Sequence, residues 1–230
     1  MITSSIQDEM PIQLDSESVE KTLSIIELIK SGGLAGQLII ALLSVLLVVA
    51  LYIYFERLFT IKAASKVDPN FMNQIKDHVI NGNMEAAKAV CAQVNSPVSR
   101  LIDKGISRIG RPLADINSAI ENAGKLEVYS LEKNVSILAT ISGAAPMIGF
   151  LGTVIGMILS IFEIANSGGQ IDIKLLADGL YTAMTTTVAG LVVGIVAYIA
   201  FNHLVGRTNK VVYQMEANSV EFLDLLNEPI

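Results

Sequence analysis

The sequence has little of what soluble enzymes and nucleic-acid-binding proteins usually carry. Its 230 residues include no tryptophan, one cysteine and two histidines, and only 17% of them are charged. One cysteine cannot pair within the chain, which excludes a disulfide framework. The net charge of −6 argues against a nucleic-acid-binding protein. Because 52% of the residues are apolar, the chain is not intrinsically disordered, and a membrane protein with polar parts remains.

The residue types that could support catalysis or bind a metal form no recognisable pattern. His78 and His203 lie far apart, and neither has metal-ligand spacing around it. Cys91 falls on an apolar helical stripe, which favours a small core residue. The segment 152–156 (GTVIG) lacks the lysine of a phosphate-binding loop. We therefore expect no enzyme activity, no metal site and no cofactor.

Three segments are long and apolar enough to span a membrane. Leu38–Phe55, Val135–Phe162 and Gly179–Phe201 contain no charged residue, and a helix needs about 20 apolar residues to cross the hydrocarbon core. Residues 56–133 carry eleven basic residues, whereas residues 1–37 carry two basic and six acidic ones. Since basic segments stay in the cytoplasm, we predict a periplasmic N-terminus and a cytoplasmic C-terminus.

The predicted fold is all-α, a polytopic membrane protein with three transmembrane helices and a helical cytoplasmic domain. An amphipathic pattern before Gly32 predicts a short helix that either lies on the outer membrane face or packs on the bundle. The predicted order is a periplasmic arm (1–37), transmembrane helix 1 (38–57), a cytoplasmic helical domain (58–133), transmembrane helix 2 (134–162), a periplasmic loop (163–175), transmembrane helix 3 (176–204) and a cytoplasmic tail (205–230).

The cytoplasmic segment shows signals for helix starts and stops. Asp68-Pro69 and Ser96-Pro97 each place a capping residue before a proline suited to a first helical turn. Turns are predicted at 81–83 and at Gly110. No strong breaker follows Pro112 until Pro146, so the second transmembrane helix is predicted to begin well inside the cytoplasm.

Small residues form stripes on the second and third spans. Their spacing is typical of helices whose backbones approach closely, and it predicts a homo-oligomer held by these stripes. Threonines lie beside them, and two interpretations remain open: helix packing, or a path lined by water or ions. The stripe residues singled out for packing are Gly149, Gly152, Gly156, Ala183, Gly190 and Gly194.

The three uncharged cores contain no Asp, Glu, Lys, Arg or His, and the nearest carboxylates, Glu163 and Asp178, lie at the outer ends. Moving a proton through hydrocarbon usually needs a titratable group or a wet cavity. If this chain takes part in proton flow, another subunit must supply the intramembrane carboxylate.

Two motifs carry a resemblance to a known family. Residues 145–157 (APMIGFLGTVIGM) and 181–191 (YTAMTTTVAGL), together with Glu56-Arg57 and the order of the segments, resemble the MotA/TolQ/ExbB proton-channel family, most closely its ExbB branch. The resemblance implies a homopentamer in the bacterial inner membrane. It would surround two copies of an ExbD-like partner with one membrane helix bearing an Asp. Proton flow would drive a TonB-like protein that energises outer-membrane transport.

The resemblance also implies roles for individual residues. Thr153 and Thr187 match the family's pore-facing threonines. Thr182 stands where many ExbB-type members carry a glutamate, so the resemblance does not imply a carboxylate at this position; Asp178, one turn earlier, could substitute for it. A TolQ-like or motility-type subunit, a helical scaffold without ion flow and a membrane enzyme are the alternatives.

Overall fold

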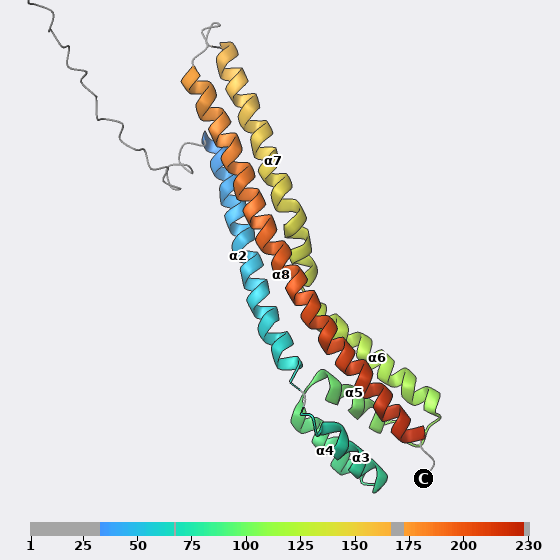
Figure 1. Cartoon of the computed structure of the whole chain (residues 1–230). Coiled ribbons are helices and arrows are strands. Elements are labelled where there is room, and N and C mark those ends of the chain that lie inside the picture. Colours follow the sequence, from blue (N-terminus) through green and yellow to red (C-terminus); the bar gives the residue numbers. More distant parts are fainter. Residues whose placement is uncertain (1–32, 67, 167–172, 228–230) are drawn as a thin grey trace, which may run out of the picture.

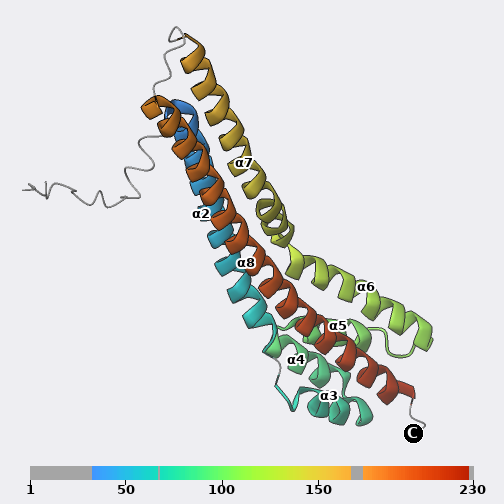
Figure 2. The ribbon, with the colours of Figure 1, turned by 45° about the horizontal axis from the view of Figure 1, so that its top comes forward.

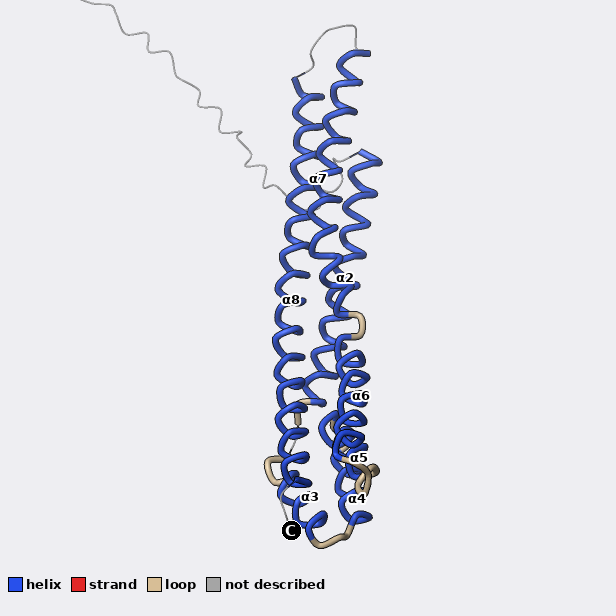
Figure 3. The backbone as a smooth tube through the Cα atoms, turned by 90° about the vertical axis from the view of Figure 1, so that its right-hand side faces the viewer, coloured by secondary structure: helices blue, strands red, loops and turns tan. Residues whose placement is uncertain are grey.

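The computed structural model describes residues 33–66, 68–166 and 173–227. Within these ranges all regular structure is helical and no strand occurs (Figure 3), which confirms the predicted all-α fold. The amphipathic helix predicted before Gly32 lies outside the described residues. The helices are α2 (Gly33–Ala64), α3 (Phe71–Ile80), α4 (Met84–Val94), α5 (Pro97–Ile106), α6 (Leu113–Glu132), α7 (Val135–Asn166) and α8 (Ile173–Asn227).

Three of these helices are long and apolar enough to cross a membrane, namely Ala35–Ala64, Val135–Asn166 and Gly179–Asn227. The prediction of three spans is confirmed. Only 22%, 17% and 33% of their most apolar stretches is buried within the chain. The remaining apolar side chains face outward, where lipid or further protein must cover them.

The α2, α7 and α8 helices run side by side in one half of the molecule (Figures 1 and 2). α8 then continues unbroken for 55 residues in all, roughly 80 Å at 1.5 Å per residue. Its last part lies along α5 and α6 at the other end of the molecule. The predicted C-terminal tail is therefore the end of the third long helix. We call α3–α6 together with residues 205–227 the polar domain.

Phe222 of α8 is fully buried in the polar domain, as part of one hydrophobic core that continues into the long helices. Gly105 of α5 allows this packing, because a Cβ at that position would lie 2.5 Å from a ring carbon of Phe222. The same Cβ would lie 2.9 Å from Ile120 of α6. Three helices therefore meet at one glycine, and the end of α8 holds α5 and α6 together.

One of the two predicted helix starts is correct. Ser96 caps α5 in a reciprocal capping box with Ser99, and Pro97 occupies the first turn. The Asp68-Pro69 prediction is wrong, because α3 begins two residues later at Phe71. The Asp68 carboxylate accepts a hydrogen bond from the Asn70 backbone N–H at 2.8 Å and so stabilises a turn before the helix.

The prediction of a helix that runs without a break from Pro112 into the second span is also wrong. α6 ends at Glu132, and Asn134 adopts a left-handed conformation (φ 63°) before α7 begins. Figure 2 shows the two helices meeting at an angle. Asparagine tolerates this conformation better than most residues. Pro146, by contrast, lies inside α7 without ending it.

Arg57 connects the end of α2 to the polar domain. Its side chain is buried, pairs with Glu56 and donates a hydrogen bond to the Ser130 carbonyl of α6 at 3.1 Å. A buried guanidinium needs such partners, since leaving it unpaired is costly. The contact fixes α6 close to the point where α7 begins.

Candidate functional site

The closest contact between helices is that of α7 with α8, and glycines make it possible. A Cβ at Gly149 would lie 2.8 Å from the Thr186 carbonyl oxygen, and one at Gly190 would lie 2.6 Å from the Ala145 carbonyl oxygen. A Cβ at Gly194 would lie 2.7 Å from the Pro146 ring. Real Cβ atoms do not approach this closely, so only glycine lets the two backbones touch.

The other predicted packing residues belong to the same contact. Gly152 faces the Thr186 side chain, and a Cβ at Gly156 would lie 3.1 Å from the Cβ of Ala183. We predicted that these stripes contact a helix from another copy of the chain, and that prediction is wrong. The stripe spacing shows that a helix comes close, and the helix that does so is α8 of the same chain.

Threonine hydroxyls cross this contact. The Thr187 hydroxyl donates to the Gly149 carbonyl at 3.1 Å. The Thr186 hydroxyl donates to the Ala183 carbonyl at 2.8 Å and approaches the Gly149 carbonyl at 3.4 Å. Thr186 is fully buried, whereas Thr187 is half-buried. The Gly149 carbonyl of α7 is thus approached by the hydroxyls of both Thr186 and Thr187 of α8.

Thr153 lies one turn beyond Gly149 on α7. It is half-buried, and its hydroxyl donates to the Phe150 carbonyl of its own helix. A hydroxyl that donates to a carbonyl keeps its oxygen lone pairs, so Thr153 and Thr187 can each still accept a hydrogen bond. Thr187 thus lies at the Gly149 carbonyl, whereas Thr153 lies one turn further along α7 and is bonded within its own helix.

The other two predicted pathway residues lie elsewhere. Thr182 is buried and faces α2, where a Cβ at Gly36 would lie 2.9 Å from its methyl group. Asp178 belongs to α8, and its side chain is outside the described residues. Thr182 thus packs against α2, whereas Thr187 bonds to Gly149 of α7.

Sequence reasoning gave too little weight to Thr186 and Ser160. Ser160 donates to the Gly156 carbonyl and fills the space beside Gly179. The helical spacing places Ser160 on the small-residue stripe of the second span and Thr186 on the face beside the stripe of the third, but it predicted no role for either. Their burial depends on which helix packs there, and that information is absent from the spacing.

No group of three or more metal-ligating side chains occurs in the described residues. The single thiol is also unsuited to act as a nucleophile or a metal ligand. Cys91 is buried in the core of the polar domain. Burial, with a smaller contribution from the nearby negative charge of Asp103, raises the pKa of the Cys91 thiol to about 12.

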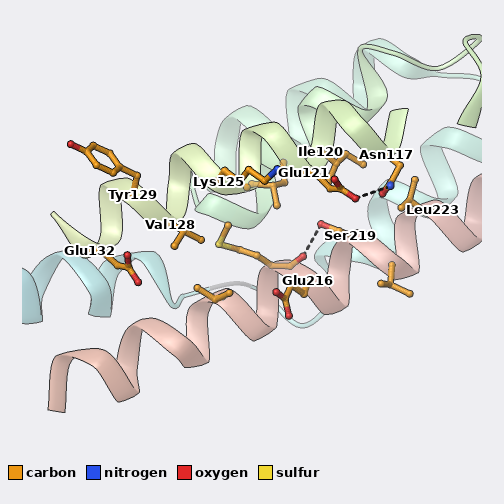
Figure 4. A pocket seen from close by; sticks show the side chains of 15 residues that line it. Asn117, Ile120, Glu121, Lys125, Val128, Tyr129, Glu132, Glu216, Ser219 and Leu223 are labelled. Carbon is orange, nitrogen blue, oxygen red and sulfur yellow. Dashed lines mark hydrogen bonds between the residues drawn. The ribbon is translucent and has the colours of Figure 1, made fainter. Parts of the chain in front are cut away.

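The polar domain carries an open groove of about 610 Å³ between α6 and α8. Figure 4 shows side chains from both helices along it, with Glu121 held by Asn117 at one edge. Its walls are mainly apolar, and charged groups stand along the edges. Among its polar lining residues the hydrogen bond described between side chains, from Asn117 to Glu121, joins two residues of α6. The α7–α8 contact therefore remains the stronger candidate site.

Comparisons with known proteins bear on this contact. The chain is 26% identical over 194 residues to a putative biopolymer transport protein ExbB homolog of Methanothermobacter thermautotrophicus, a match that covers 84% of this chain and 67% of that protein. It is 39% identical over 79 residues to biopolymer transport protein ExbB of Helicobacter pylori, covering 34% of this chain and 54% of the relative. It is 34% identical over 119 residues to the Tol-Pal system protein TolQ of Haemophilus influenzae, covering 52% and 47% respectively.

The two bacterial matches span about half the length of those relatives. The sequence profile of the MotA/TolQ/ExbB proton channel family matches residues 93–217. This range is more than half of the chain, and it includes both membrane motifs and the whole α7–α8 contact. The chain belongs to the MotA/TolQ/ExbB proton channel family.

Proposed function

We propose that this protein is the ExbB-like subunit of a proton-driven motor in the bacterial inner membrane. It assembles as a homo-oligomer, a pentamer by resemblance, around an ExbD-like protein whose single membrane helix carries an Asp. The motor passes work to a TonB-like protein that drives outer-membrane transport. In this arrangement the N-terminus is periplasmic and the polar domain is cytoplasmic. The chain has no catalytic role.

The observation that carries the proposal is a pair of half-buried hydroxyls, Thr187 at the Gly149 carbonyl and Thr153 one turn further along α7, in stretches that contain no Asp or Glu. Thr187 and Thr153 each donate to a backbone carbonyl and keep acceptor capacity. A partner Asp that takes up and releases protons needs neighbours that serve both of its protonation states. As bonded in the structure, each hydroxyl can accept a hydrogen bond from the protonated carboxyl, and it donates to the ionised carboxylate by rotating its hydrogen away from the backbone carbonyl.

The other two predicted pathway residues, Thr182 and Asp178, are proposed to contribute less to proton movement. Thr182 faces α2 and contributes to packing more than to proton movement. Asp178 is one of two carboxylates, with Glu163, at the outer ends of the spans. It is proposed as an entry group for protons.

Complementation of a strain that lacks its native ExbB tests the proposal. The Thr153→Val and Thr187→Val double variant keeps the shape of both side chains and removes both hydroxyls. We expect normal membrane levels and a large loss of uptake that depends on the proton-motive force. Thr140→Val is the matched control, because Thr140 is an exposed α7 residue bonded only to its own helix. Full uptake by the double variant would leave a scaffold role as the better explanation.

A TolQ-like subunit is the second candidate, and the H. influenzae TolQ match over 52% of the chain favours it. The two functions differ in the client and not in the motor. Purification of the full chain in mild detergent distinguishes them by what remains bound. A TonB-like partner supports the first function, and a partner of the Tol system supports the second.

A further inference from the structure

The open groove between α6 and α8 lies in line with Thr187. α8 is one unbroken helix of 55 residues, so positions that are a whole number of turns apart share one face. Glu216 and Leu223, which line the groove, follow Thr187 by about eight and about ten turns respectively. The groove therefore continues, in the polar domain, the face of α8 that carries Thr187.

The floor of the groove is apolar and lies beyond the reach of lipid. Val128 of α6 and Val212 and Leu223 of α8 are half-buried there, and Val220 at the edge is 58% exposed. Val212 lies about 16 Å along α8 past Phe201, where the uncharged stretch ends. Acyl chains end near the last apolar residues of a span, because those residues match the thickness of the hydrocarbon core. Protein is therefore the cover that this surface requires.

The edges of the groove are mainly acidic. Glu121 and Glu132 of α6 and Glu216 of α8 line it as exposed residues, and Lys125 adds a single positive charge. Glu121 accepts a hydrogen bond from Asn117 at 2.9 Å, and its carboxylate has acceptor capacity left for another donor. An apolar floor between acidic edges (Figure 4) matches an amphipathic helix that carries Lys or Arg beside its apolar stripe.

The proposed partner of this chain can supply such a helix. A protein that crosses the membrane once has one end in the cytoplasm, and Lys and Arg are enriched beside that end. If its membrane helix lies against Thr187, a continuation along the same face of α8 arrives at the groove after about 38 Å. A second copy docked groove to groove would instead bring the acidic edges of both copies together, which is unfavourable.

We propose that the groove between α6 and α8 binds the basic cytoplasmic flank of the single-span partner as an amphipathic helix. The proposal rests on the proposed function for the identity of this partner, and it adds the surface that the partner occupies. Docking here fixes the depth of the partner helix, and so of its Asp, relative to Thr187. The docked segment lies about 25 residues from the Asp if the connection is helical, and about 11 residues from it if the connection is extended.

Photo-cross-linking in the purified complex tests the proposal. The full chain is isolated in mild detergent with its bound partner, and a benzophenone maleimide is attached to Val220→Cys in a Cys91→Ala background. Tyr213→Cys is the matched control, because Tyr213 is also an exposed residue of α8 but does not line the groove. Irradiation should join Val220→Cys to a peptide of the single-span protein that contains Lys or Arg, and Tyr213→Cys should not form this cross-link.

Charge variants test the basis of recognition. Glu216→Gln should lower the cross-link yield about threefold, as expected for loss of one exposed ion pair. Glu221→Gln should leave the yield unchanged, because Glu221 is an exposed residue of the same helix outside the groove. Raising the ionic strength from about 0.1 M to about 1 M should also lower the yield, since salt screens exposed charges. Equal yields from the Glu216→Gln and Glu221→Gln variants would overturn the proposal.

The identity of the cross-linked protein decides the remaining outcomes. A cross-link from Val220→Cys to a second copy of the chain overturns the proposal, and so does a yield no higher than that of Tyr213→Cys. Thr187→Val should leave the cross-link unchanged, because the Thr187 hydroxyl lies outside the groove. If the Thr153→Val and Thr187→Val double variant loses uptake but no partner is captured at the groove, the docking proposal alone fails. If the partner is captured and that double variant keeps full uptake, the proposed motor role alone fails.

Discussion

The hydroxyl of Thr187 on α8 donates to the carbonyl of Gly149 on α7 at 3.1 Å. This hydrogen bond crosses between the two helices at the place where their backbones touch. It therefore combines a structural contribution with the proposed role in proton movement, and the two can be separated by experiment.

Thr187→Val should lower stability only slightly but reduce proton-coupled work strongly. Loss of one hydrogen bond between membrane helices costs about 0.6 kcal/mol. Thr185→Val on the same helix is the matched control, because Thr185 donates only to the Tyr181 carbonyl of its own helix. Thr187→Ser should retain function, since it keeps the hydroxyl. Equal uptake by the Thr187→Val and Thr185→Val variants would show that the bond matters for packing alone.

Gly190→Ala should destabilise the protein, whereas Gly143→Ala should not. The added methyl at Gly190 would lie 2.6 Å from the Ala145 carbonyl oxygen, and neither backbone can move away freely. Overpacking of this kind costs about 1–3 kcal/mol. A Cβ at Gly143 meets nothing within 4 Å, and alanine favours a helix by up to about 1 kcal/mol. Unfolding of both variants in detergent micelles gives the comparison, and equal stabilities would contradict the close contact.

The parts of the fold that were predictable depend on local chemistry. Uncharged stretches such as Leu38–Phe55 identify membrane helices by length alone, and the Ser96-Pro97 pair identifies a helix start because its capping bonds are local. The α6–α7 break was missed because it depends on one asparagine in a left-handed conformation, a weak signal without glycine or proline. The start of α3 was misplaced because an aspartate can stabilise a turn as readily as a helix.

The site was only partly predictable for a related reason. Helical spacing identified Gly149 and Gly190 as places of close approach, but spacing cannot say whether the approaching helix belongs to the same chain. The burial of Thr186 and the role of Gly105 likewise depend on which helices meet there. Local patterns thus predicted which face of each helix packs closely, whereas the tertiary structure determines which helix packs against that face.

Cys91 should be unreactive toward iodoacetamide at pH 8 in the folded protein and reactive after denaturation. Its pKa is about 12 in the folded state, against 9.0 as the ordinary value. Above pH 9 the unfolded thiol loses its proton while the folded one keeps it, so the unfolded state binds fewer protons and stability falls as pH rises. Cys91→Ala should remove this loss between pH 9 and 10.5. A fall of the same slope in Cys91→Ala and the wild type would assign it to other groups.

The orientation of the chain can be tested with single cysteines in a Cys91→Ala background. Asn166→Cys lies at the end of α7 that is farthest from the polar domain, and Arg108→Cys lies in the turn after α5; both positions are exposed. Because eleven basic residues lie between positions 56 and 133, we expect the polar domain to remain in the cytoplasm. A membrane-impermeant maleimide should therefore label Asn166→Cys in cells with a permeabilised outer membrane, and Arg108→Cys only after the inner membrane is opened. Labelling of Arg108→Cys with the inner membrane intact would reverse the orientation and place the polar domain in the periplasm.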